Sequence, residues 1–187
     1  MLRKLLLLVC VMCATNAIAQ HENSTPSKTT QKQDDPKIDY KQTGAPMPSL
    51  IFIPYYDTNS KETDHKKYMT NSDFDNGANL FVMMFNPTCS HCQDETVILG
   101  KNGSLFKRSK VLLLANIIMK PYMGDFVALT HVDRHPFMYL GVDSTDFINN
   151  LFLYQQLPQL NIYNSERKLI RTYTGEVAID SLKKYIQ

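Results

Sequence analysis

The feature that most constrains this chain is a pair of cysteines, Cys89 and Cys92, between an apolar run and a predicted helix. Residues 80–85 are apolar throughout, as in a strand buried on both faces of a sheet. A helix is predicted from Ser90 to about Leu99. With Cys89 at its N-cap and Cys92 in its first turn, the two sulfurs lie on one face, within reach of a disulfide. The unpaired N–H groups and the helix dipole favour thiolate at the first sulfur, which indicates a nucleophile for thiol–disulfide exchange.

Residues 1–19 are typical of a secretory signal peptide. Arg3 and Lys4 form a positive start, residues 5–14 form a short apolar core, and Ala17-Ile18-Ala19 is a cleavage pattern. The apolar core is too short to span a bilayer. We therefore expect an exported, periplasmic protein.

A lipid-anchored protein is an alternative that we favour less. A lipid-bearing cysteine follows a small residue, whereas Val9 and Met12 precede Cys10 and Cys13. Cleavage removes these two of the chain's four cysteines and leaves the Cys-x-x-Cys pair alone. A structural disulfide is possible for such a pair, but a bridge that closes so small a loop stabilises little, so a redox role fits better.

The charge and composition of the remaining chain limit its organisation and partners. The net charge is +2, and loss of the signal removes two positive charges, so we expect no nucleic-acid partner. Residues 20–45 are polar and Pro-containing, which predicts a flexible linker. Residues 46–187 contain the apolar runs and are long enough for one domain with a core.

The apolar runs alternate between strand-like and helix-like patterns, which predicts an α/β fold with a central mixed β-sheet flanked by helices. The residues between 132 and 144 are ambiguous. Strands are expected over residues 50–56, 68–70, 80–85, 111–119, 159–163 and 169–173, and helices over 90–99, 121–132, 144–154 and about 178–186.

On three features the chain resembles the exported thioredoxin-like thiol–disulfide oxidoreductases of Gram-negative bacteria. They are the Cys89-Ser90-His91-Cys92 motif after a strand, Leu157-Pro158 before a hairpin strand, and Gly175 before the last helix. The resemblance covers residues 46–187 and implies a thioredoxin-like fold. The first strand and the one after it then correspond to an extra N-terminal β-hairpin.

The resemblance also implies roles for individual residues. Cys89 attacks a substrate disulfide and Cys92 resolves the mixed disulfide. Pro158 follows a cis peptide bond, and Leu157, Pro158 and Thr88 line the substrate groove. The expected partners are substrate proteins with thiols or disulfides and a membrane or periplasmic redox partner. No cofactor or metal is expected, and the protein is expected to be a monomer.

Several residues depart from the family pattern. Thr88 replaces the Trp that usually precedes the first cysteine, and Met83 stands where thioredoxins place a buried Asp that helps to deprotonate the second. His91 resembles the His of disulfide oxidants and, when protonated, stabilises the thiolate of the first cysteine. Asp94 and Glu95 are expected to be solvated acids at the start of the helix. The direction of electron flow stays open.

Three other functions are weighed against this one. A zinc or copper site would combine the cysteines with His91 or with His131 and His135, but no second Cys-x-x-Cys is expected after cleavage, which removes Cys10 and Cys13. A peroxidatic centre is disfavoured because Asn86 stands where its Thr is usual. A non-catalytic module that only binds a partner would not need a reactive dithiol.

Overall fold

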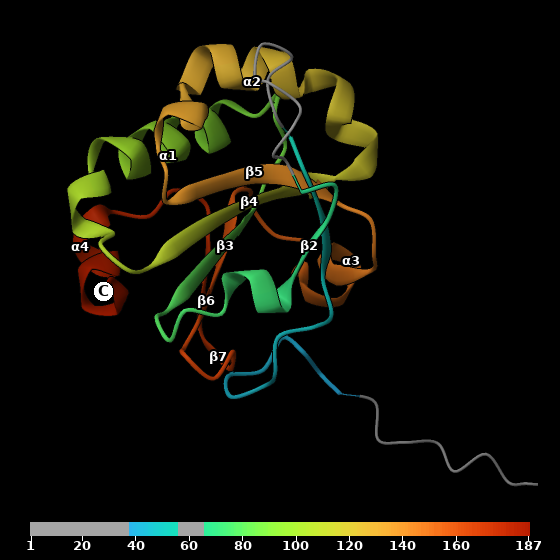
Figure 1. Cartoon of the computed structure of the whole chain (residues 1–187), viewed down its shortest axis with the longest axis vertical. Coiled ribbons are helices and arrows are strands. Elements are labelled where there is room, and N and C mark those ends of the chain that lie inside the picture. Colours follow the sequence, from blue (N-terminus) through green and yellow to red (C-terminus); the bar gives the residue numbers. More distant parts are fainter. Residues whose placement is uncertain (1–37, 56–65) are drawn as a thin grey trace, which may run out of the picture. The chain divides into compact units, whose positions relative to one another are not determined.

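The computed structural model describes residues 38–55 and 66–187, and these residues form one seven-stranded mixed sheet with helices on both faces (Figure 1). The strand order is β2-β1-β5-β4-β3-β6-β7. The strands are β1 Ile51–Pro54, β2 Met69–Thr70, β3 Leu80–Met84, β4 Lys110–Asn116, β5 Met138–Asp143, β6 Gln159–Tyr163 and β7 Leu169–Thr174. The α-helices are α1 Ser90–Lys101, α2 Met123–Thr130, α3 Phe147–Leu151 and α4 Ile179–Leu182, and 3₁₀ turns link several elements.

The strand directions bring the start of α1 to one edge of the sheet. Strands β3, β4 and β5 are parallel, so their carboxyl ends meet at that edge. Strands β6, β7, β1 and β2 each pair with their neighbours in antiparallel fashion. The residues between β3 and α1, and those that follow β4, therefore lie at the same edge.

Two apolar cores cover the two faces of the sheet. On β3, Phe81 and Met83 pack with residues of α1, α2 and α4, whereas Leu80, Val82 and Met84 pack with α3 and the 3₁₀ turn at Asn71–Phe74. Every residue of β3 is buried, as the continuous apolar run predicts. Each buried large apolar side chain contributes about 1.5–3 kcal/mol to stability, so β3 is a firm base for the helix that follows it.

The predicted central mixed sheet is confirmed, and so is the N-terminal hairpin, since β1 pairs with β2 in antiparallel fashion. The strand that the sequence left ambiguous is β5, whose burial pattern alternates only at its start. Tyr139 on this strand packs against the aromatic ring of Phe74 instead of facing solvent. This contact comes from a distant segment, which is why local periodicity gives no clear strand signal.

Several predicted elements are shorter than expected. The last helix, predicted over about 178–186, is α-helical only in α4 and continues as a 3₁₀ turn at Lys183–Tyr185. The strand predicted over 111–119 ends at Asn116, because the Asn116 side chain accepts a hydrogen bond from the Ile118 N–H at 3.1 Å and begins a 3₁₀ turn. The helix predicted over 144–154 is reduced to α3. Asp143 accepts hydrogen bonds from the backbone N–H groups of Thr145 and Ile148, which delays the start of the helix.

Contacts with the domain begin before its predicted start at Pro46. The Gly44 N–H donates to the Leu169 carbonyl at 2.7 Å, and the Leu169 N–H donates to Ala45 at 2.8 Å. The predicted linker over 20–45 thus overlaps the described unit at residues 38–45. The predicted signal peptide, the rest of the linker and Tyr56 at the end of the first predicted strand lie outside the described residues.

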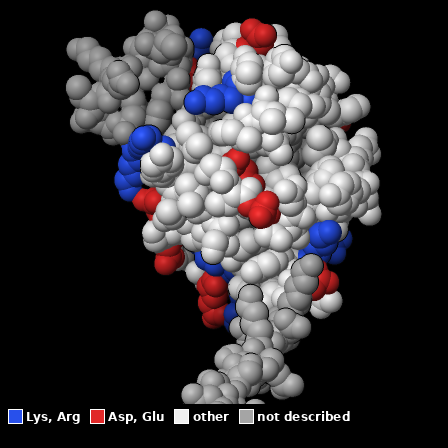
Figure 2. Space-filling view, turned by 90° about the vertical axis from the view of Figure 1, so that its right-hand side faces the viewer, with Lys and Arg blue, Asp and Glu red and all other residues white. Residues whose placement is uncertain are grey.

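Within the described ranges, no helix has the length and apolar character needed to cross a bilayer. Figure 2 shows the face on the right-hand side of Figure 1, where basic and acidic side chains are interspersed on a larger uncharged surface. The described surface in this view has no extended patch of one charge.

Candidate active site

The two cysteines lie at the start of α1, with the predicted difference between their positions. Cys89 is the N-cap residue in extended conformation, and its carbonyl accepts hydrogen bonds from the Cys92 and Gln93 N–H groups, both at 3.1 Å. Cys89 is half-buried and Cys92 is fully buried, and both thiols are free. The Cys89 sulfur is therefore accessible to a second protein, whereas the Cys92 sulfur is covered.

A hydrogen-bonded turn holds the segment before Cys89. The Asn86 side-chain oxygen accepts from the N–H and hydroxyl groups of Thr88, each at 3.0 Å. The Asn86 carbonyl accepts from the Cys89 N–H at 3.1 Å, and Gln93 donates to the Pro87 carbonyl at 2.9 Å. Thr88 is exposed beside the first cysteine. The fixed turn sets the position of the Cys89 sulfur.

Burial raises the pKa of the Cys92 thiol to about 12. The backbone N–H of Asn86 opposes this by hydrogen-bonding the sulfur. The Cys89 side chain, which lies within hydrogen-bonding reach of Cys92, and the charge of Glu95 act in the same direction as burial. The second cysteine is thus held as a thiol in the reduced protein, and its proton has to be removed before it can attack.

Glu95 is buried, contrary to the prediction that it is a solvated acid. Its side chain is 1% exposed, and its Oε2 atom accepts a hydrogen bond from the Val177 N–H at 3.0 Å. Its Oε1 atom has no hydrogen-bond partner among the described residues. Burial raises the pKa of Glu95, the Val177 N–H lowers it, and the charge of Glu176 raises it. The prediction failed because position 95 is one turn beyond Cys92 on the inward face of α1, while Asp94 is exposed as expected.

His91 faces an acid that the sequence did not single out. Its Nδ1 atom is hydrogen-bonded to Oε1 of Glu176, and both side chains are about half exposed. Glu176 directly follows Gly175, whose φ of +76° favours glycine. Gly175 was the only sequence signal near this acid. It indicated a turn before the last helix and gave no indication of a charged partner for His91.

The same segment also holds the loop that contains Leu157 and Pro158. The Leu157–Pro158 peptide bond is cis, as predicted, and the Pro158 carbonyl accepts from the Gly175 N–H at 2.8 Å. Residues 175–177 therefore contact His91, Glu95 and the Pro158 loop. We call these three residues the bridging segment.

A shallow apolar hollow lies beside the active-site turn. Its volume is about 180 Å³, and Leu157 and Asn86 both line it. The other lining residues are apolar except for one Asn: Met84, Phe85, Asn116, Met119, Ile148 and Phe152. The hollow joins the turn before Cys89 to the loop of the predicted substrate groove.

The two histidines of the metal alternative lie elsewhere. His131 ends α2 in the left-handed conformation, and the His135 ring packs against Gly100 near the end of α1. Gly100 is eight residues beyond Cys92, about 12 Å along the helix. Among the described residues, no group of three or more His, Cys, Asp or Glu side chains is placed to hold a metal ion.

Comparisons with known proteins complete the description of the fold. No family model matches this sequence, and no curated protein matches it significantly. Solved structures do match. The thioredoxin domain of a thiol-disulfide oxidoreductase from Bacteroides vulgatus has a TM-score of 0.57 at 15% identity, covering 78% of this chain and 99% of that one. This chain has a thioredoxin-like fold.

Two further structures agree with this thioredoxin-like assignment. StoA from Bacillus subtilis has a TM-score of 0.53 at 11% identity, covering 74% of this chain and 96% of that one. The dsbF protein of MTB, solved in mixed oxidized and reduced forms, has a TM-score of 0.53 at 16% identity, covering 74% and 92%. The predicted thioredoxin-like fold is confirmed, and the Cys-x-x-Cys motif starts the helix after a central strand of that fold.

Proposed function

We propose that this protein is an exported, periplasmic thiol–disulfide oxidoreductase that exchanges disulfides with substrate proteins through Cys89 and Cys92. The observation that carries the proposal is the unequal burial of two facing thiols at the start of α1. Cys89 is accessible and lies at the positive end of the helix dipole, which favours the attacking thiolate. Cys92 is covered, which suits a resolving thiol.

The exchange takes two displacement steps. The Cys89 thiolate attacks one sulfur of a substrate disulfide, a mixed disulfide forms, and the other substrate sulfur leaves as a thiolate. The Cys92 thiolate then attacks the Cys89 sulfur, which releases the second substrate thiolate and leaves a Cys89–Cys92 disulfide. Two electrons pass to the substrate. The reverse sequence oxidises a substrate dithiol, and a redox partner restores the starting state.

Glu95 is the proposed proton acceptor for Cys92 in the second step. Cys92 needs one because its pKa is raised to about 12. Met83, at the position of the thioredoxin Asp, cannot accept a proton, whereas Glu95 is buried one turn beyond Cys92 with one oxygen unpartnered among the described residues. Because burial raises the pKa of Glu95, its carboxylate is a stronger base than an ordinary one, which suits a proton acceptor.

The proposed substrate groove runs over Thr88, Leu157 and Pro158. Thr88 is exposed beside Cys89, and Leu157 lines the apolar hollow next to the turn. A groove of this character suits an extended polypeptide with an apolar residue near its cysteine. The signal-like residues 1–19 support export, and N-terminal sequencing of the periplasmic protein tests it, with Gln20 expected as the first residue.

Two variants test the dithiol mechanism. Cys89→Ser should abolish both reduction of a protein disulfide and oxidation of a dithiol, because no mixed disulfide can form. Cys92→Ser should accumulate mixed disulfides with partner proteins, because the resolving thiol is missing. Turnover that persists in Cys89→Ser would contradict the mechanism, and a Cys92→Ser variant that traps no protein would favour the binding-module alternative.

A further inference from the structure

A second concave site lies at the edge of the sheet opposite to the cysteines. Its volume is about 820 Å³, within the range of small-molecule sites. The end of α1, the loop that leads into β4 and the residues before β5 form its walls. Since α1 has 12 residues, the site is about 18 Å from Cys89 along the helix. It is independent of the redox centre.

The lining of this site is basic. Among the described residues, the lining includes Lys101, Lys107, Arg108 and Lys110 but no Asp or Glu. Within the described part of the chain, none of these four side chains is in an ion pair. The Lys110 ammonium lies 5.2 Å from the centre of the Tyr139 ring, so the other three cations are the ones available to a ligand. If the main-chain carbonyl of Gln187 were a C-terminal carboxylate, it would offset one of these positive charges and leave the site positive.

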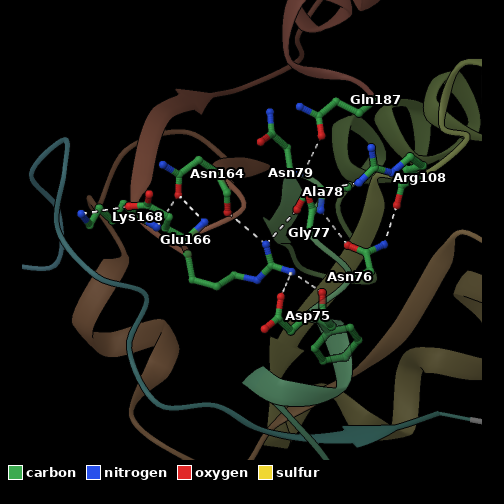
Figure 3. A network of polar contacts seen from close by, with 12 residues as sticks. Asp75, Asn76, Gly77, Ala78, Asn79, Arg108, Asn164, Glu166, Lys168 and Gln187 are labelled. Carbon is green, nitrogen blue, oxygen red and sulfur yellow. Dashed lines mark hydrogen bonds and ion pairs between the residues drawn. The ribbon is translucent and has the colours of Figure 1, made fainter.

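A network of backbone contacts holds the basic loop in place (Figure 3). The Asn76 side chain donates to the Arg108 carbonyl at 2.7 Å, and the Arg108 and Ser109 N–H groups donate to a Gln187 oxygen at 2.7 and 2.9 Å. The Arg108 guanidinium donates to the Gly77 carbonyl at 3.3 Å through one nitrogen. The remaining N–H groups of the guanidinium make no other hydrogen bond within the described residues. The loop is thus organised before any ligand arrives, which lowers the entropy cost of binding.

The floor of the site is aromatic. The rings of Phe106 and Phe137 are stacked with their centroids 4.8 Å apart, and the half-buried Phe137 ring closes against Gly103. A Cβ atom at position 103 would lie 2.8 Å from the Phe137 ring. Glycine therefore allows the aromatic pair to sit beside the basic loop, and one flat apolar surface adjoins three cations.

We propose that this site binds a small phosphate ester with a flat ring, the chemistry of a nucleoside phosphate. The guanidinium of Arg108 and the ammonium groups of Lys101 and Lys107 match a doubly charged phosphate, which accepts several charge-assisted hydrogen bonds. The ring packs against Phe137, where an aromatic pair gains from stacking. A phosphate alone would leave the aromatic floor unused.

A soluble ligand fits this site better than a membrane surface. Binding in the interface of a bilayer uses apolar side chains that protrude next to the basic ones. Among the described residues that line the site, Phe106 is buried and Phe137 is half-buried, so the apolar surface is recessed. A recessed aromatic surface can contact a small molecule that enters the site, but it cannot insert into a bilayer.

Calorimetric titration with adenosine 5′-monophosphate tests the proposal, with adenosine and inorganic phosphate as partial ligands. The monophosphate should bind at least about tenfold more tightly than either partial ligand, and less tightly as salt is raised. The double substitution Lys101→Gln and Lys107→Gln should weaken its binding by at least about tenfold. Within the described ranges, neither lysine side chain makes an ion pair that would hold the loop, so this variant should fold normally.

Two matched variants separate the phosphate and ring contacts. Phe137→Leu should weaken binding of the monophosphate but leave binding of inorganic phosphate unchanged. Lys168→Gln, which removes an exposed lysine paired with Glu166, should change neither. The proposal is overturned if the monophosphate does not bind at millimolar concentration, if the double lysine variant binds it as well as the unaltered protein, or if the protein binds anionic phospholipid vesicles but not the monophosphate.

Discussion

Glu95 and Val177 are joined by a 3.0 Å hydrogen bond that ties the first half of α1 to the chain after β7. The neighbouring residues of the bridging segment contact His91 through Glu176 and the Pro158 carbonyl through Gly175. The redox helix and the loop of the proposed substrate groove thus share one support. A change in the protonation of Glu95 alters the hydrogen bond through which the bridging segment holds α1.

Glu95→Gln should stabilise the fold at pH 8 but not at pH 4. The pKa of Glu95 is raised in the folded protein, so the carboxylate disfavours folding once the pH exceeds the unfolded value of 4.5. Below that value the acid is protonated in both states, and Gln resembles it. Urea unfolding of the two proteins at both pH values measures the difference. Equal free energies of unfolding at pH 8 would show that Glu95 ionises without cost.

The same substitution tests the proposed proton transfer. Release of substrate from the mixed disulfide should slow by about 10²-fold or more, because Gln cannot accept the Cys92 proton. Formation of the mixed disulfide should be unaffected, since Cys89 carries it. Stopped-flow kinetics resolve the two steps, and Asp94→Asn, which alters the exposed neighbouring acid, is the matched control.

Cys92 should resist alkylation in the folded protein. A thiol with a pKa of about 12 has about one ten-thousandth of its molecules as thiolate at pH 8, against about one tenth for the ordinary value of 9.0. In Cys89→Ser, burial still covers Cys92, so its reaction with iodoacetamide should be at least about a hundredfold slower than in guanidinium chloride. Mass spectrometry follows the modification. Rapid labelling of the folded variant would mean that the thiol is accessible.

Glu176→Gln should raise the reduction potential of the cysteine pair. Removing the acid takes away one negative charge beside His91 and the start of α1. The site becomes more positive, which favours the thiolate and hence the reduced form. Because both side chains are about half exposed, the rise should be small, on the order of 10–20 mV. Equilibration with glutathione measures it, with Glu166→Gln as a distant control, and a lower potential would contradict the electrostatic account.

Arg167→Met should destabilise the fold without changing the dithiol. The Arg167 guanidinium donates to the carbonyls of Ala78 at 2.8 Å, Asn164 at 3.0 Å, and Phe74. Loss of these bonds should cost about 2–3 kcal/mol. Met keeps the apolar stem, so denaturant unfolding reports the polar contacts. The neighbouring variant Lys168→Met should change stability by less than about 0.5 kcal/mol, and an equal loss in both would point to a general effect of the turn.

Sequence patterns were most informative where the signal is local. The continuous apolar run over 80–85 is β3, and the motif after it starts α1 with Cys89 at its N-cap. The predicted cis bond before Pro158 is present. These features depend on neighbouring residues, or on a motif whose parts keep their spacing within the thioredoxin-like fold.

The sequence by itself therefore determined the thioredoxin-like sheet and the place of the cysteine pair in it. Only the tertiary structure decided that Glu95 is buried and that His91 faces Glu176, because those contacts come from residues 82 or more positions away. Nothing in the local pattern distinguishes a buried helix-start acid from a solvated one, since both suit the positive end of the dipole. Burial depends on what the rest of the chain places against the helix, and here the bridging segment does so.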